Sequence, residues 1–190
     1  MKSLVQQALG EGWYELPPAL QAHYRSGDVT EEGYMDIEYP SFMQWYLNVL
    51  RLFGALVNRR GRGAVTLVER SQNHGQQHWK RTIRYPSGEV AYFNSLLISA
   101  GGDQLIEFVN PFLGLQMSVV AHDGMVQYSG VRFVFKIGRI VIPIPEWLVL
   151  GHTSIKESAL DETHYAMDFR LTHPLFGQVF RYSGVFKVEL

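Results

Sequence analysis

Apolar and polar residues alternate over most of the chain from residue 63 to residue 190, and turn-forming residues interrupt the alternation at short intervals. Alternation with a period of two is typical of strands that bury one face. We expect a break at Gly138, at a bulge or a tight turn within the longest alternating run. The strands predicted in this half are 64–70, 76–85, 89–99, 104–110, 115–122, 125–142, 152–160, 164–172 and 178–188. The pattern therefore predicts one long antiparallel meander.

The first forty residues predict two short helices, at residues 3–9 and 16–24, followed by one strand at residues 28–39. Val29, Tyr34 and Ile37 are the candidates for the buried side of that strand. Pro40 ends the strand because proline cannot donate to a ladder of hydrogen bonds.

The strongest predicted helix runs from Phe42 to Val57, with Ser41 as its N-cap. Its apolar residues fall at helical spacing, and more apolar residues flank them. A stripe of this width indicates burial on most sides. The stripe consists of Phe42, Trp45, Tyr46, Val49, Leu52, Phe53 and Leu56. A curved sheet clasping the helix would bury it.

These elements predict one α+β domain over residues 1–190. We expect a large curved antiparallel sheet or half-barrel, lipocalin-like or helix-grip-like by analogy, with short N-terminal helices. The Phe42–Val57 helix should pack against the concave face or plug one end. The pattern leaves open whether the sheet closes into a barrel.

Composition narrows the function classes. The chain has 190 residues, 46% hydrophobic and 18% charged, which suits a packed core. A net charge of -1 gives no basic field for nucleic acid. The absence of cysteine excludes disulfides and thiolate chemistry. Residues 1–7 do not resemble a signal peptide, and the longest apolar run is too polar for stable membrane insertion. We therefore expect a soluble, cytoplasmic protein.

Several segments, taken in order, resemble a bacterial family known as domain of unknown function 4166. They are residues 16–24, 79–83, 93–97, 114–119, 142–148, 157–161, 173–177 and 181–184, in a match that spans roughly residues 8–187. Members of that family also occur fused to saccharopine-dehydrogenase-like domains, so the resemblance implies a partner oxidoreductase as one interpretation. This chain has no Gly-rich phosphate loop, so dehydrogenase chemistry does not transfer, and we predict no cofactor.

Charged residues on predicted inner faces are the first candidate chemistry. Arg81 shares a face with Trp79, and Glu157 lies on the apolar face of its own strand. A charge on an inner face is costly unless it is paired. Arg81 with Glu157 or Glu107 would then form a polar anchor for the head group of a ligand. An ordinary inter-strand pair, or side chains that point outward, is the alternative.

The favoured function is non-catalytic binding of an apolar or amphipathic small molecule inside the sheet. The polar residues predicted to bind it are Arg81, Ser95 and Glu157. The predicted wall residues are Trp45, Phe53, Trp79, Phe93, Phe133 and Phe169. An interior without a cavity near roughly 300 Å³ would contradict this hypothesis.

Two other function classes stay open. One is a hydrolase or isomerase for a hydrophobic substrate, with His23 and Glu157 as acid and base; clustering of the two beside a pocket would favour it. The other is an interaction domain that modulates a partner oxidoreductase, which an exposed apolar patch would favour.

The remaining charged groups predict no site. The seven histidines lack a metal-binding spacing, so we predict no metal. The acid pairs Glu31–Glu32 and Asp161–Glu162 are expected to be solvated in turns. The cluster Arg59, Arg60 and Arg62 is interpreted as a solvated loop, although it could meet the phosphates of a lipid surface.

Overall fold

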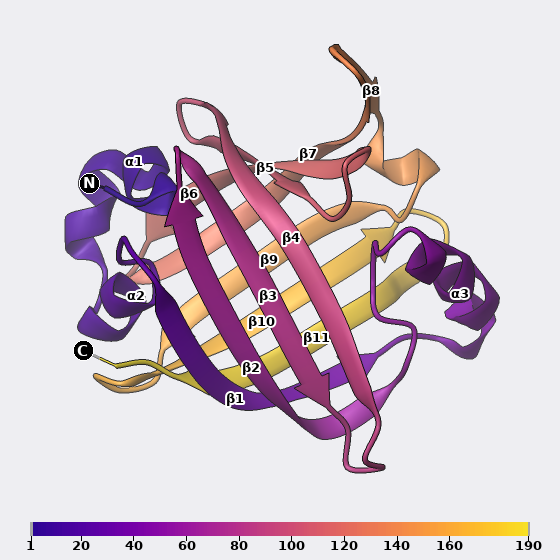
Figure 1. Cartoon of the computed structure of the whole chain (residues 1–190), viewed down its shortest axis with the longest axis horizontal. Helices are drawn as coiled ribbons and strands as arrows, with labels where there is room; N and C mark the ends of the chain where they lie inside the picture. Colours follow the sequence, from indigo (N-terminus) through magenta and orange to yellow (C-terminus); the bar gives the residue numbers. More distant parts are fainter. Residues whose placement is uncertain (1, 190) are drawn as a thin grey trace.

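The computed structural model describes residues 2–189 and folds them into a closed antiparallel β-barrel (Figure 1). The strands are β1 (Val29–Glu38), β2 (Gly61–Asn73), β3 (Gln76–Arg84), β4 (Val90–Gly101), β5 (Gln104–Phe108), β6 (Leu113–His122), β7 (Met125–Ile137), β8 (Ile140–Ile144), β9 (His152–Ala159), β10 (His164–His173) and β11 (Gly177–Lys187). All of them except β8 form a ring of ten strands among the described residues, closed by pairing of β11 with β1. β8 pairs with β7 alone and projects from the ring as a hairpin.

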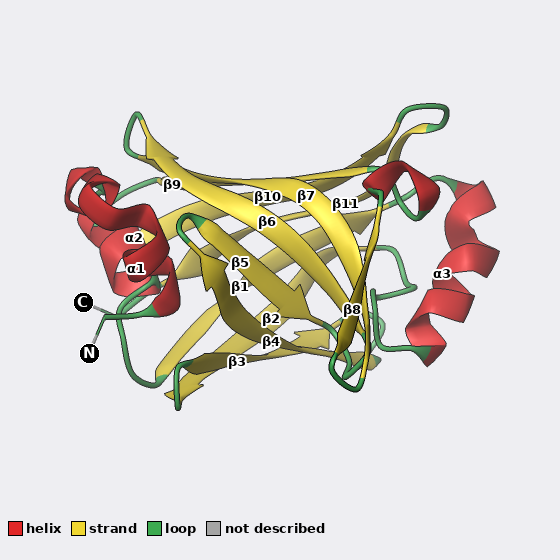
Figure 2. Ribbon diagram, turned by 90° about the horizontal axis from the view of Figure 1, so that it is seen from above, coloured by secondary structure: helices red, strands yellow, loops and turns green. Residues whose placement is uncertain are grey.

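Short helices lie at both ends of the barrel. They are α1 (Leu4–Leu9), η1 (Gly10–Glu15), α2 (Pro18–His23), η2 (Ser41–Met43), α3 (Gln44–Leu52) and η3 (Glu146–Leu148), of which the η elements are 3₁₀-helices. Figure 2 shows α1 and α2 at one end and α3, η3 and β8 at the other. Within residues 2–189 there is no helix whose length and apolar character would let it cross a membrane.

The predicted meander is confirmed, and so is the break at Gly138, which lies in the turn between β7 and β8. The α+β class and the half-barrel are corrected to a mostly-β, closed barrel. Closure depends on pairings of β6 with β7, β7 with β9, and β1 with β11. The last of these joins strands from the two ends of the chain, so no local pattern could have revealed it.

The long helix is the clearest error of the sequence-based prediction. α3 ends at Leu52, because Gly54 adopts a left-handed conformation (φ 70°) that is common just past helix ends. The N-cap prediction for Ser41 is also wrong, since Ser41 begins a 3₁₀ turn without a side-chain cap. Leu47 and Leu50 are buried, whereas Trp45 and Leu52 are exposed. The helix therefore covers one end of the barrel, and strand side chains occupy the interior.

The inward face of β1 was only partly predicted. Val29 and Ile37 are buried as expected, but Tyr34 lies on the opposite face and is exposed. Glu31 shares the inward face with Val29 and is buried, so the prediction of a solvated acid in a turn is wrong. Gly33, also on this face, lies against β11: a Cβ atom there would come within 2.2 Å of the Val185 carbonyl oxygen.

Candidate functional site

A group of polar side chains, here called the His23 cluster, lies inside the barrel near α2. Its members are His23, Tyr24, Glu31, Tyr128, Glu157 and Tyr165. His23 is the last residue of α2 and Tyr24 follows it, while the others come from β1, β7, β9 and β10. All six are buried. Buried ionisable groups are costly unless they are hydrogen-bonded, so the partners of each member matter.

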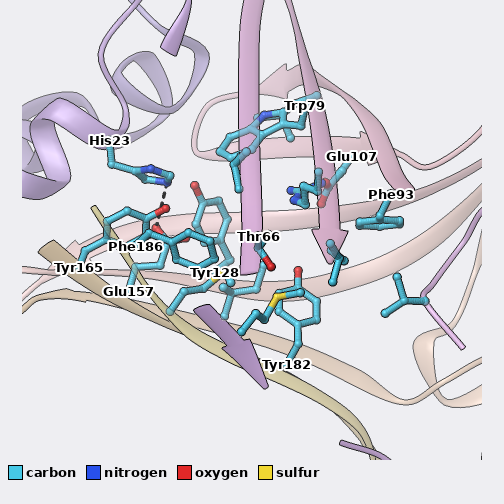
Figure 3. A pocket seen from close by; sticks show the side chains of 18 of the residues that line it. His23, Thr66, Trp79, Phe93, Glu107, Tyr128, Glu157, Tyr165, Tyr182 and Phe186 are labelled. Atoms are coloured by element: carbon cyan, nitrogen blue, oxygen red, sulfur yellow. Dashed lines mark hydrogen bonds and ion pairs between the residues drawn. The ribbon is translucent and has the colours of Figure 1, made fainter. Parts of the chain in front are cut away.

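His23 is held in one orientation by Glu31. The imidazole Nδ1 lies 2.8 Å from both carboxylate oxygens, and the Tyr165 hydroxyl donates to the same carboxylate at 2.9 Å. A carboxylate that accepts the Nδ1 proton leaves Nε2 as the free ring nitrogen. That Nε2 atom is buried, has no hydrogen-bond partner among residues 2–189, and lies 3.9 Å from the nearer oxygen of Glu157. Figure 3 shows the His23 ring beside Glu157 on the same side of the cavity.

Glu157 is the second acidic group of the His23 cluster. Tyr24 donates a hydrogen bond to its carboxylate, and Tyr128 donates to the Tyr24 hydroxyl at 2.8 Å. Burial raises the pKa of Glu157, and the nearby His23 only partly offsets this effect. Burial, reinforced by the charge of Glu157, also raises the pKa of Tyr24 well above its usual value. The protonated form of Glu157 is thus favoured more than in water.

A second polar group, here called the Arg81 anchor, consists of Arg81, Ser95 and Glu107 on β3, β4 and β5. Arg81 donates to Ser95 Oγ at 3.0 Å and to Glu107 Oε1 at 3.2 Å, and Ser95 Oγ donates to the same oxygen at 2.5 Å. The guanidinium also lies 5.0 Å from the Trp79 ring centroid and 5.2 Å from that of Phe93. The predicted pairing of Arg81 with Glu107 is confirmed; its alternative partner, Glu157, belongs to the other cluster.

Trp79 lies between the two polar groups. Its ring is 5.8 Å from the His23 ring, and the guanidinium of Arg70 stacks 5.2 Å from its centroid. Arg70 is buried, and burial lowers the pKa of its guanidinium, with a partial opposing effect from Glu31. Two of its nitrogens, Nε and Nη1, have no partner in the described part of the chain. The interior therefore holds more hydrogen-bonding capacity than the protein itself uses.

Both polar groups border one interior cavity of about 70 Å³. Figure 3 shows His23 and Glu157 on one side of it and Glu107 and Phe93 on the other. A second, more apolar cavity of about 50 Å³ adjoins it beneath α3. The residues that line both are Leu56, Phe93, Glu107 and Tyr182. The barrel is not solid, but neither cavity approaches roughly 300 Å³. The interior therefore fails the volume criterion set for the predicted container, and binding of a drug-sized ligand in it is contradicted.

The structure brings together most of the predicted site residues. Those that line a cavity are His23, Trp79, Arg81, Phe93 and Glu157 in the first, and Phe93, Phe133 and Phe169 in the second. Ser95 supports Arg81 from the neighbouring strand. Trp45 and Phe53 were predicted as wall residues, and this is wrong. Both are exposed at the α3 end and line neither cavity, because the helix lies outside the barrel.

Sequence reasoning missed five members of the interior network: Tyr24, Glu31, Arg70, Tyr128 and Tyr165. Glu31 alternates in phase with Val29, and this spacing could have identified it as an inward residue. The tyrosines gave no comparable signal, since an alternating tyrosine is equally consistent with an ordinary core position. No group of three or more His, Asp or Glu side chains suited to a metal ion occurs within residues 2–189.

Comparison with known protein families gives one match. The family model described as "Domain of unknown function (DUF4166)" matches residues 16–186, which include every residue of the His23 cluster and of the Arg81 anchor. A search of curated proteins found no match.

Proposed function

We propose that this chain, which belongs to the DUF4166 family of domains of unknown function, binds a compact amphipathic small molecule inside its barrel. The observation that carries the proposal is the unpartnered Nε2 atom of His23, buried at the edge of a cavity beside Glu157. An unsatisfied buried polar group destabilises a fold by about 1–3 kcal/mol. A bound molecule that satisfies it recovers that free energy.

The geometry favours a hydroxyl as the polar group of the ligand. With its Nδ1 proton donated to Glu31, His23 accepts a hydrogen bond at Nε2. Burial raises the pKa of Glu157, and in its protonated form this carboxyl donates a hydrogen bond. A single hydroxyl can donate to His23 Nε2 and accept from protonated Glu157, whereas a carboxylate has no proton to donate to His23. An alcohol or phenol therefore fits the site better than a carboxylate does.

The apolar part of the ligand would extend toward α3. The second cavity is lined almost entirely by apolar side chains, and only the shared wall separates it from the first. Together the two cavities are smaller than the engineered cavity of about 150 Å³ that binds benzene. The ligand is therefore a molecule of few heavy atoms, or one that displaces Leu56. Leu56 lies in an irregular segment after α3. Among the residues that line both cavities, it alone does not belong to a barrel strand.

A titration with phenol and benzene tests this proposal. The two molecules share shape and differ by the hydroxyl, whose hydrogen bond contributes about 1 kcal/mol, or roughly fivefold in affinity. The methyl groups of Met35, Met117 and Met167 border the first cavity and serve as ¹³C NMR probes, with exposed Met125 as the internal control.

We expect phenol to shift the three cavity methyls at lower concentration than benzene, and His23→Phe to remove that preference. Binding of neither molecule, or equal binding of both to the wild-type protein, would contradict the proposal. The methyl spectra themselves report whether the variant is folded.

Acid–base catalysis is the second candidate, and the approach of His23 to Glu157 beside the cavity favours it. Oriented by Glu31, His23 could accept a proton at Nε2 while Glu157 donates one, as in a hydrolase or isomerase. Hydrolysis of ethyl acetate, an ester of few heavy atoms, tests the hydrolase form. His23→Phe should abolish it and Glu32→Gln, on the outer face of the same strand as Glu31, should leave it unchanged. Activity that survives His23→Phe would exclude His23 as the base.

A further inference from the structure

Large apolar side chains are exposed at the α3 end of the barrel. They come from α3, the turn after β5, the β7–β8 hairpin, η3 and the turn after β10. The residues are Phe42, Trp45, Val49, Leu52, Phe53, Phe112, Phe135, Ile137, Ile140, Val141, Ile142, Trp147, Leu148, Leu175 and Phe176. We call this set the α3-end face. Figure 2 shows its elements gathered at the end opposite α1 and α2.

Contacts between these segments join them into one surface. The ring of Phe42 on the approach to α3 lies 5.9 Å from that of Phe176, which stacks on His173 at 4.8 Å. His173 in turn bonds through Nε2 to the carbonyl oxygen of Trp147 in η3 at 2.9 Å.

On the other flank, the Asn110 side chain donates to the Phe53 carbonyl at 2.6 Å. Phe112, two residues further on, lies 6.5 Å from Phe135 of β7. The apolar residues therefore form a contiguous end face, which is larger than single exposed side chains require.

α3 carries its apolar residues on two sides. Leu47 and Leu50 face the barrel, whereas Trp45, Val49 and Leu52 point to solvent, and Leu52 is 83% exposed. The spacing of the outward three, i, i+4 and i+7, places them on one stripe of the helix. Packing against the barrel explains why Leu47 and Leu50 are apolar, but it does not explain Trp45, Val49 and Leu52. The outer stripe is the part of the helix that a partner would cover.

Basic residues outnumber acidic ones around this face, where the acidic residues are Glu38, Glu89 and Glu146. Residues 39–68 and 133–145 contain no Asp or Glu, and their basic residues are Arg51, Arg59, Arg60, Arg62, Lys136 and Arg139. Arg59 pairs with Glu89, and Arg62 lies 4.0 Å from Glu38. The other four have no carboxylate partner within residues 2–189. At the opposite end acidic residues outnumber the basic residues Lys2, Arg25 and Lys187; the acidic ones are Glu11, Glu15, Asp28, Asp103, Asp123, Asp161 and Glu162.

A polar groove adjoins the outer stripe of α3. It has a volume of about 770 Å³ and lies between α3 and the β3–β4 turn. Its charged lining residues are Arg51, Arg59, Arg60 and Glu89, of which Glu89 pairs with Arg59, and Asn48 and Asn58 also line it. Amide and guanidinium donors in an open groove match phosphate oxygens, which accept several hydrogen bonds at once. A lipid surface likewise has phosphate groups next to apolar acyl chains, so donors beside apolar residues match it.

We propose that the α3-end face docks on the surface of an anionic lipid bilayer. The outer stripe of α3 and the β8 hairpin enter the boundary between head groups and acyl chains, while the unpaired basic residues meet lipid phosphates. The acidic residues at the far end face away from the membrane, so the charge distribution also orients the protein. This inference does not depend on a ligand in the barrel, although the second cavity lies directly beneath α3.

Sedimentation with lipid vesicles tests the proposal. The wild-type protein should bind vesicles of phosphatidylcholine mixed with phosphatidylserine, bind phosphatidylcholine alone more weakly, and lose the difference as salt rises. Leu52→Glu should weaken binding by about tenfold or more, since it removes one buried Leu and adds a charge. Leu160→Glu is the matched control, because Leu160 is also exposed but lies at the opposite end, and it should bind like the wild type.

The double variant Arg60→Gln with Arg139→Gln should weaken binding to the anionic vesicles by roughly tenfold, and by much less to the neutral ones. Trp45 and Trp147 lie on the face, so their fluorescence should shift to the blue on binding. Absence of binding to both kinds of vesicle would overturn the proposal, as would equal losses for Leu52→Glu and Leu160→Glu. A dimer in solution that Leu52→Glu dissociates would overturn it in favour of a second copy of the chain.

Discussion

Replacement of Glu31 tests whether the His23 cluster is a connected network. Glu31 accepts from His23 Nδ1 and from the Tyr165 hydroxyl, and its side chain is 2% exposed. Glu31→Ala leaves both donors buried and unpaired, at about 1–3 kcal/mol each. It also removes a negative charge near the buried guanidinium of Arg70. The two unpaired donors together should lower the free energy of unfolding by about 2–6 kcal/mol.

Glu32→Ala is the matched control, since Glu32 is the next residue of β1 and faces solvent. It should change the free energy of unfolding by less than about 0.5 kcal/mol. Glu31→Gln keeps a hydrogen-bond acceptor for one of the two donors, so it should lower the free energy of unfolding by about 1–2 kcal/mol. Urea unfolding followed by circular dichroism measures all three as shifts in midpoint at constant slope. Equal midpoints for Glu31→Ala and Glu32→Ala would refute the network.

Three further predictions concern α3, the shared cavity wall and a surface carboxylate. Leu47→Ala should lower the free energy of unfolding in urea by about 2–5 kcal/mol, because Leu47 is fully buried on the side of α3 that faces the barrel. Leu52→Ala should change it by less than about 0.5 kcal/mol, because Leu52 is exposed. Similar losses for the two variants would contradict the position of the helix. Leu56→Ala should join the two cavities and tighten phenol binding in the NMR titration, and weaker binding would show that the cavities are not a common site. Although partial burial opposes it, hydrogen bonds from two arginines lower the pKa of Asp168 from 3.8 to about 2. The ionised carboxylate therefore stabilises the fold above pH 3.8, and thermal melts should show that stabilisation disappearing as the pH falls to about 2; Asp168→Asn should lack this step.

The strands were predictable from sequence because each depends on a local pattern. Alternation and turn residues located every strand of the meander to within a few positions, including the break at Gly138. The closed ring was not predictable in the same way. It requires β1 to pair with β11, and these strands lie about 150 positions apart in the chain, so their pairing follows from tertiary packing rather than from local propensity.

The α3 segment shows why an apolar stripe alone can mislead. Apolar spacing continues through Leu56, but Gly54 provides an end signal within it, and the chain turns there. The pattern also gives no information on which apolar face is buried. Here the face of α3 that carries Leu47 packs against the barrel, and the face that carries Leu52 is exposed to solvent. A surface helix that carries apolar residues toward a partner has the same sequence signature as a buried one.

The candidate site was partly predictable for a physical reason. Arg81 and Glu157 stood out because a charge on an apolar face requires a partner, and both are indeed beside a cavity. Glu31 was assigned to a turn, so the same argument was not applied to it. Its partnership with His23 joins residues on α2 and β1 whose relative position depends on how α2 closes the barrel end.

A crystal structure of the protein soaked with phenol tests the central claim most directly. We expect a phenol molecule inside the barrel, with its hydroxyl within hydrogen-bonding distance of His23 Nε2 and Glu157 and its ring directed toward Leu56. Phenol bound only on the outer surface, with the interior side chains closed around His23, would contradict it.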